Sequence, residues 1–168
     1  MRIRLPICVV GLLACTPAIA LADVVWPALF LETRIFTWWA ILIGLALEYL
    51  FIRRLFALSP QRAVVATVVA NTISALAGLP LIPLSGVAWE IFPGMLYMSL
   101  FKWGTFNPVT WGATFVLACL INTAIEAAVY RRLFKLSVQR RQFLWLFLAN
   151  AASVGVAFGS LFVVPVET

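Results

Sequence analysis

The sequence predicts an all-α integral membrane protein with four transmembrane helices, built as two tandem, parallel helical-hairpin repeats after an N-terminal signal peptide. Three observations support this fold class. The 168 residues are 64% hydrophobic and only 11% charged, whereas soluble domains are nearer half apolar and a quarter charged. Four apolar segments are long enough to cross a bilayer, and one polar pattern occurs twice. A chain this short cannot bury so many apolar side chains from water, so we expect most of it to lie in lipid.

The first 22 residues have the layout of a secretory signal peptide. Arg2 and Arg4 precede an apolar stretch, and Ala20 and Ala22 place small residues just before Asp23. This order predicts cleavage after Ala22.

Two alternatives to cleavage stay open. Residues 5–31 could be retained as a fifth span, although Pro17 and Asp23 disfavour a continuous helix. Cys15 could instead be lipidated, although the sequence before it is an imperfect lipoprotein signal.

Four segments of the remaining chain have the length and composition of membrane helices. They are residues 35–52, 63–84, 109–130 and 143–164. We therefore expect a first hairpin over residues 23–84 and a second over residues 109–168. Pro80 and Pro83 lie near the end of the second segment, where a helix can stop at little cost.

Residues 85–108 join the two hairpins. They are rich in aromatic residues and glycine and contain Glu90, Pro93 and Lys102. This composition is apolar enough to contact lipid but too interrupted for a regular span. We expect an interfacial or re-entrant segment on the outer face.

Basic residues predict the orientation in the membrane. Eight of the ten Lys and Arg that follow Ala22 lie in or beside two short loops; these basic loop residues are Arg53, Arg54, Arg62, Arg131, Arg132, Lys135, Arg140 and Arg141. Basic loops stay in the cytoplasm and contact anionic lipid. We therefore expect a multi-pass protein of the inner (cytoplasmic) membrane with both mature termini outside. The net charge of +6 does not indicate nucleic acid, because no nucleic-acid-binding module accompanies it.

A pattern of 15 residues occurs twice. Residues 48–62 recur as residues 126–140 with nine identical positions. After one additional residue, Arg141, the match continues at Ala70, Asn71 and Ser74 in the first hairpin and at Ala149, Asn150 and Ser153 in the second. Because both hairpins have the same orientation, we expect a pseudo-twofold axis along the membrane normal to relate them.

Five polar residues inside the expected spans form a candidate intramembrane site: Glu48, Asn71, Asn122, Glu126 and Asn150. Glu48 precedes Arg53 by five residues and lies roughly 7–8 Å inside the inner interface, whereas Asn71 lies about 13 Å inside it. Side chains tilt toward the N-terminus of their helix, so Glu48 and Asn71 are expected to lean toward each other. The same holds for Glu126 and Asn150.

Two interpretations of this polar set stay open. In the first, each Glu–Asn pair is an interhelical hydrogen bond that fixes its hairpin, typically worth under about 1 kcal/mol in a membrane. In the second, the set forms one cluster at the axis that handles a proton, a cation or a small polar solute. A carboxyl group at this depth is costly unless paired or protonated, and two close carboxyls are expected to hold at least one proton.

Small residues spaced about one turn apart predict where the helices pack closely. They lie on the same stripes as the polar residues and are Ala40, Gly44, Ala70, Ser74, Gly78, Ala118, Ala149, Ser153 and Ala157.

We expect no catalytic, cofactor-binding or metal-ligating residues. The sequence has no His, and Cys119 is the one Cys left after cleavage, so nucleophile–His pairs and thiolate clusters are excluded. The sequence favours a permease or channel-like protein. The alternative is a non-catalytic accessory or assembly subunit, and an enzyme acting on lipids is the weakest candidate. The expected partners are the lipid bilayer and either further copies in a homo-oligomer or a larger membrane complex.

Overall fold

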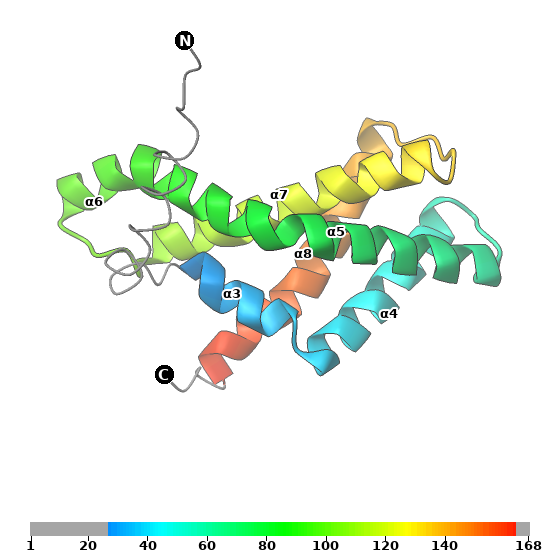
Figure 1. Ribbon diagram of the computed structural model, residues 1–168, viewed down its shortest axis with the longest axis horizontal. Coiled ribbons are helices and arrows are strands. Elements are labelled where there is room, and N and C mark those ends of the chain that lie inside the picture. The colour runs from blue at the N-terminus through cyan, green and yellow to red at the C-terminus, as the bar shows by residue number, and fades with distance from the viewer. Residues whose placement is uncertain (1–26, 164–168) are drawn as a thin grey trace, which may run out of the picture.

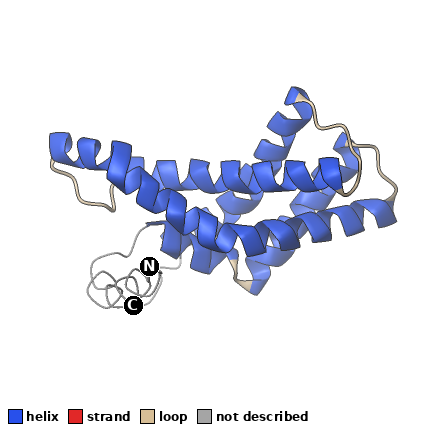
Figure 2. Cartoon of the chain, turned by 45° about the horizontal axis from the view of Figure 1, so that its top comes forward, coloured by secondary structure: helices blue, strands red, loops and turns tan. Residues whose placement is uncertain are grey.

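The computed structural model describes residues 27–163, and the predicted signal peptide over residues 1–22 lies outside them. The described chain is helical and contains no strand (Figures 1 and 2). Its elements are α3 (Pro27–Ile35), α4 (Trp38–Leu55), α5 (Pro60–Trp89), the segment η1 (Glu90–Gly94), α6 (Met95–Phe101), α7 (Pro108–Arg132) and α8 (Arg140–Val163). Segment η1 is a kink between α5 and α6, because Phe92 inside it has a non-helical φ of -166° and ψ of 127°.

Three stretches are long and apolar enough to cross a membrane: Pro60–Phe101, Pro108–Arg132 and Arg140–Leu161. A fourth is present if α3 and α4, which are bent by 78° at a short break, count as one broken span. The prediction of an all-helical protein is confirmed, and residues 27–163 include three or four helices with the properties of membrane spans. The four expected segments fall within or overlap α4, α5, α7 and α8.

The helices form two hairpins, α4–α5 and α7–α8, whose connecting loops lie at the same end of the molecule (Figure 1). The most extensive contacts join different hairpins, because α5 packs along α7 and α4 packs along α8. Both loops contain a residue in the left-handed conformation, Ala57 (φ 49°) in the first and Lys135 (φ 55°) in the second. Arg62 also links the loops, since its Nη2 donates to the carbonyl of Phe134 at 3.0 Å.

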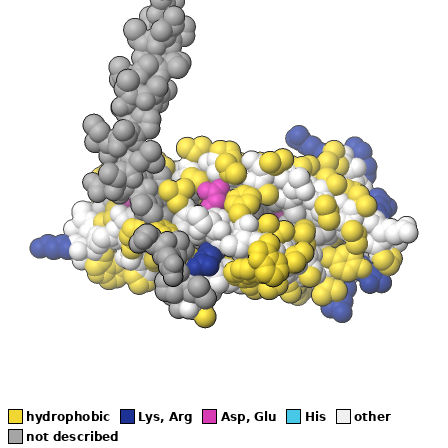
Figure 3. Space-filling model, turned by 60° about the horizontal axis from the view of Figure 1, so that its bottom comes forward, with side chains coloured by type: hydrophobic (Ala, Val, Ile, Leu, Met, Phe, Trp, Pro, Cys, Tyr) yellow, Lys and Arg dark blue, Asp and Glu magenta, His cyan; other side chains and the backbone are white. Residues whose placement is uncertain are grey.

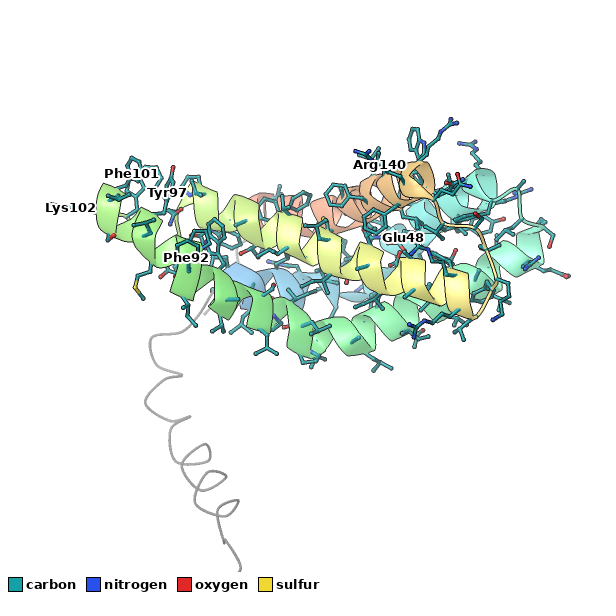
Figure 4. All side chains as sticks on the ribbon, turned by 90° about the horizontal axis from the view of Figure 1, so that it is seen from above. Glu48, Phe92, Tyr97, Phe101, Lys102 and Arg140 are labelled. Carbon is teal, nitrogen blue, oxygen red and sulfur yellow. The ribbon has the colours of Figure 1, made fainter. Side chains whose placement is uncertain are left out.

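The basic loop residues are all exposed. Figure 3 shows most Lys and Arg side chains gathered at one end of the molecule, with apolar side chains along its flank. Lys102, which ends α6 in a left-handed conformation, lies at the opposite end (Figure 4).

Helix α5 is longer than the sequence predicts. We expected its end near Leu84, but it runs on to Trp89 with Pro80 and Pro83 inside it. A proline inside a membrane helix is tolerated when neighbouring helices cover the backbone around it. Here α3 packs across α5, and a Cβ added to Gly86 would lie 3.1 Å from the Cβ of Ala28.

The start of α8 also differs from expectation. Ser59 is the N-cap residue of α5, although its side chain makes no capping hydrogen bond. Ser137 is the matching residue in the second loop and is the N-cap that the repeat predicts for α8, but α8 begins at Arg140. The reason is local: the first loop has Pro60, which favours the first helical position, whereas Val138 is buried and its carbonyl accepts a hydrogen bond from Arg131.

Two apolar clusters make up the core. One lies toward α3 and includes Leu31, Ala118 and Val154. The other lies toward the loops and includes Ile52 and Leu146. The polar residues of the candidate site occupy the helix turns between these two clusters, so the site is a polar layer inside an apolar bundle.

Candidate intramembrane polar site

The two carboxyl groups of the candidate site are buried in the bundle. Glu48 on α4 is 3% exposed and Glu126 on α7 is 2% exposed. Figure 4 shows Glu48 among the helices, nearer the end that carries Arg140 than the end that carries Lys102. Small residues allow this burial: a Cβ added to Gly44, one turn from Glu48, would lie 3.4 Å from the Cβ of Ser153 on α8.

Each carboxyl group accepts one hydrogen bond from its own hairpin. Asn71 Nδ2 donates to Glu48 Oε2, and Asn150 Nδ2 donates to Glu126 Oε2 at 2.9 Å. Both amide groups also donate to the carbonyl four residues earlier on their own helix, Thr67 or Leu146. The structure thus brings together the two Glu–Asn pairs that the side-chain tilt predicts.

The second oxygen of each carboxyl group accepts a hydrogen bond from the other hairpin. Ser153 Oγ donates to Glu48 Oε1 at 2.7 Å, and Ser74 Oγ contacts Glu126 Oε1 at 3.4 Å. The two Ser residues were expected to contribute only close packing. Their polar role had a signal in the sequence, because each follows its Asn by three residues in both hairpins and so shares its helix face.

These four contacts join all four long helices through neutral donors. The two carboxyl groups are also close enough to interact electrostatically. An amide and a hydroxyl can donate to a carboxylate or to a neutral carboxylic acid, because the neutral acid keeps acceptor oxygens. The arrangement can therefore hold the pair with or without a proton on either member.

Asn122 is not part of this hydrogen-bonded set. It lies on α7 one turn from Glu126, and its Oδ1 faces α5, 3.4 Å from where a Cβ on Gly78 would stand. The nine small residues expected to pack closely are buried, apart from Ser153, which is half-buried.

Two further polar residues, Tyr130 and Thr67, lie beside the carboxyl pair, and neither was predicted from the sequence. Tyr130 on α7 is 0% exposed, and it interacts electrostatically with Glu126 and Glu48 and neighbours Thr67 on α5. The hydroxyl groups of Tyr130 and Thr67 and the Oδ1 of Asn150 are buried without a well-oriented hydrogen bond in the described chain. The sequence did contain a sign of Tyr130, because in the repeated pattern this polar residue takes the place of the apolar Ile52 of the first hairpin.

Aromatic rings separate the carboxyl pair from the loops. The ring of Tyr130 lies 6.0 Å from that of Phe56 and 6.4 Å from that of Phe134, one from each loop region. On this side the polar layer is closed by tightly packed side chains.

On the other side the layer opens into a pocket of about 310 Å³. Its walls come from the α3–α4 bend, α4, α5 and α8, with Asn122 from α7, and both Glu48 and Glu32 line it. Glu126 is not among the lining residues. The two carboxyl groups therefore differ: Glu48 faces a cavity, and Glu126 is enclosed by protein.

Comparison with family models, curated proteins and solved structures finds no match to this chain.

Proposed function

We propose that this protein is a small inner-membrane permease or channel-like protein that moves a proton, a cation or a small polar solute through the Glu48–Glu126 cluster. One observation carries the proposal: Glu48, a buried carboxyl group in a membrane bundle, is held by neutral donors and lines a 310 Å³ pocket. Carboxyl groups at such depth are costly and usually serve a pathway or a proton relay. A purely structural Glu–Asn bond needs no cavity.

In the same proposal the two hairpins are parallel repeats related by a pseudo-twofold axis along the membrane normal. The loops at one end, the left-handed residues Ala57 and Lys135 and the equivalent Glu–Asn and Glu–Ser contacts support it. The basic loop residues then face the cytoplasm, and both termini of the signal-cleaved chain lie outside. The protein is not an enzyme, and it acts as a homo-oligomer because four helices enclose only a narrow path.

We assign residues 85–108 to the lipid–water interface on the outer face of the inner membrane. Helix α5 alone has 30 residues, about 45 Å of helix, which is longer than the roughly 30 Å of a bilayer core. Helix α6 follows it beyond a kink at Phe92. Part of this stretch must therefore leave the hydrocarbon. The projecting end carries a stack of Tyr97, Phe101 and Trp103 beside Lys102 (Figure 4), and such side chains are favoured at the interface.

The same projecting end supports the second candidate function, an accessory or assembly subunit of a larger membrane complex. No residue of α6 is buried, and four of its exposed side chains are large and apolar: Met95, Leu96, Leu100 and Phe101. A large exposed apolar patch marks an interaction site with lipid or protein.

Reconstitution tests the transport proposal directly. The purified full chain is placed in liposomes, a gradient of pH or of a monovalent cation is imposed, and flux is followed with an enclosed dye. We expect flux above that of empty liposomes, and none from the double variant Glu48→Gln/Glu126→Gln. Gln keeps the shape and the hydrogen bonding but cannot ionise. Equal flux from both proteins would contradict the proposal.

Co-purification separates the two candidates. After mild solubilisation a permease is expected alone or as a homo-oligomer, whereas a subunit brings a second protein in fixed ratio. A stoichiometric partner that is lost when Leu96 and Leu100 are both changed to Ser would favour the subunit function.

A further inference from the structure

The pocket beside Glu48 is elongated along α4 and is lined mostly by apolar side chains. It follows α4 from the bend at Phe36 past Ala40 and Gly44 to Glu48, and the part from Ala40 to Glu48 alone is about 12 Å long at 1.5 Å per residue. Of the polar lining side chains, Asn71 and Ser153 donate to Glu48, and Glu32 lies on α3, at the other end of the pocket. A volume of 310 Å³ is within the range of small-molecule sites.

The pocket opens sideways, between α4 and α5. Its rim includes Ile41 on α4 and Val68, Leu76 and Leu79 on α5, all of them exposed apolar side chains. Such side chains face lipid when the bundle is in a membrane. The opening is therefore reached from the bilayer. It lies between the two helices of the first hairpin, and α4 and α5 contact each other less extensively than α7 and α8 do.

The charge of the pocket has one sign. It contains the carboxyl groups of Glu32 and Glu48, and none of its described lining residues is Lys or Arg. Glu32 Oε1 is buried without a hydrogen-bond partner in the described chain. Figure 3 shows acidic side chains reaching the surface in the middle of a largely apolar flank.

From these features we infer that the pocket binds an amphipathic organic monocation, with its cationic group at Glu48 and its apolar body against the α4 and α5 walls. A hydrated metal ion would be left beside apolar side chains over most of the pocket, and an anion would meet two carboxyl groups. An organic cation matches both surfaces, and it partitions into the bilayer from which the pocket opens. The inference rests on the proposed function and names the class of solute.

Equilibrium binding of benzyltrimethylammonium to the full chain in lipid nanodiscs tests this inference. We expect saturable binding of one ion per chain, with little competition from neopentylbenzene, which has the same shape and no charge. Glu48→Gln is expected to weaken binding at least tenfold. Its matched control is Glu90→Gln, a carboxyl group outside the pocket, which is expected to bind as the wild type does.

A second pair of variants keeps the test valid if Glu48→Gln fails to fold. Leu76→Trp narrows the opening at a side chain that is 71% exposed, and Leu84→Trp places the same ring on the same helix, away from the pocket, at a side chain that is 60% exposed. We expect weaker or slower binding in the first variant alone. Absence of saturable binding, equal binding by both Trp variants or equal competition by the neutral compound would overturn the inference.

The outcome is separable from that of the transport proposal. Flux that depends on the carboxyl pair without binding of the organic cation would overturn this inference and leave the transport proposal standing. Binding without any flux in liposomes would support the site and remove the transport proposal.

Discussion

The two hairpins place the same polar residues in different surroundings. In each, a Glu accepts hydrogen bonds from an Asn of its own hairpin and a Ser of the other. One turn before the Glu, however, the first hairpin has Gly44 and the second has Asn122. One turn after it, the first has Ile52 and the second has Tyr130.

The helices that pack against these residues, α5 and α8, also differ: α5 has a polar residue where α8 has an apolar one. Tyr130 neighbours Thr67 on α5, and the corresponding pair in the other half is Ile52 and Leu146, both buried in the apolar cluster near the loops. The pocket meets Glu48 and not Glu126. The carboxyl groups and their donors are thus duplicated, whereas access to them is not. A duplicated polar core with one open side fits a single pathway better than two independent sites.

Labelling from opposite sides of the membrane has an all-or-none outcome and tests whether the hairpins are parallel. Single Cys residues are placed at Ser59 and Ser137, which are exposed in the two loops, in a chain whose own Cys are changed to Ser. We expect both to react with a membrane-impermeant maleimide only from the cytoplasmic side, because basic loops remain there. Reaction of the two from opposite faces would mean inverted hairpins.

Substitutions of Asn150 and Asn71 test whether the enclosed Glu126 contributes more to stability through its amide donor than Glu48, which faces the pocket, does through its own. Asn150→Ala leaves Glu126 Oε2 unpaired in a fully enclosed place, so we expect the free energy of unfolding in detergent to fall by about 1 kcal/mol. Asn71→Ala leaves Glu48 Oε2 beside the pocket, where the carboxyl group has room to reorient, and we expect about half that loss.

Asn122→Ala is the matched control for both substitutions, because its side chain lies in the same bundle outside the hydrogen-bonded set. A larger loss for Asn71→Ala than for Asn150→Ala would contradict the assignment of the open and the enclosed side.

The smallest effect is expected when the hydroxyl group of Tyr130 is removed. Its hydroxyl group is buried without a well-oriented hydrogen bond, so Tyr130→Phe is expected to change the free energy of unfolding by less than about 0.5 kcal/mol. Tyr130→Leu removes the ring that packs on Phe56 and Phe134 and is expected to cost about 2 kcal/mol or more. Equal losses for the two variants would show that the hydroxyl group, and not the ring, holds this side closed.

Much of the fold could be predicted because lipid imposes simple rules on composition and length. Long apolar runs indicated the positions of α4, α5, α7 and α8, and the Glu–Asn contacts followed from helix rise and side-chain tilt. The sequence did not predict α3 as a separate helix, because its burial depends on contacts with α5, α7 and α8. The continuation of α5 past Pro80 and Pro83 depends on the same packing.

The candidate site was predicted less completely than the fold. Asn122 shares a stripe with Glu126, and only the packing of α7 against α5 turns its amide toward Gly78. Tyr130 and Thr67 lie in apolar stretches and occur in one half only, so a search for repeated residues passes over them. The pocket is lined by residues of α3, α4, α5, α7 and α8, and no local pattern encodes how these helices come together.

The most direct test of the central claim is to measure proton or cation flux into liposomes for Glu48→Gln and Glu126→Gln separately. If the two carboxyl groups act as one site, each single substitution abolishes flux, although only Glu48 lines the pocket, and both proteins insert and fold as the wild type does. Flux at the wild-type level from either variant would contradict the claim and would leave that carboxyl group a structural role.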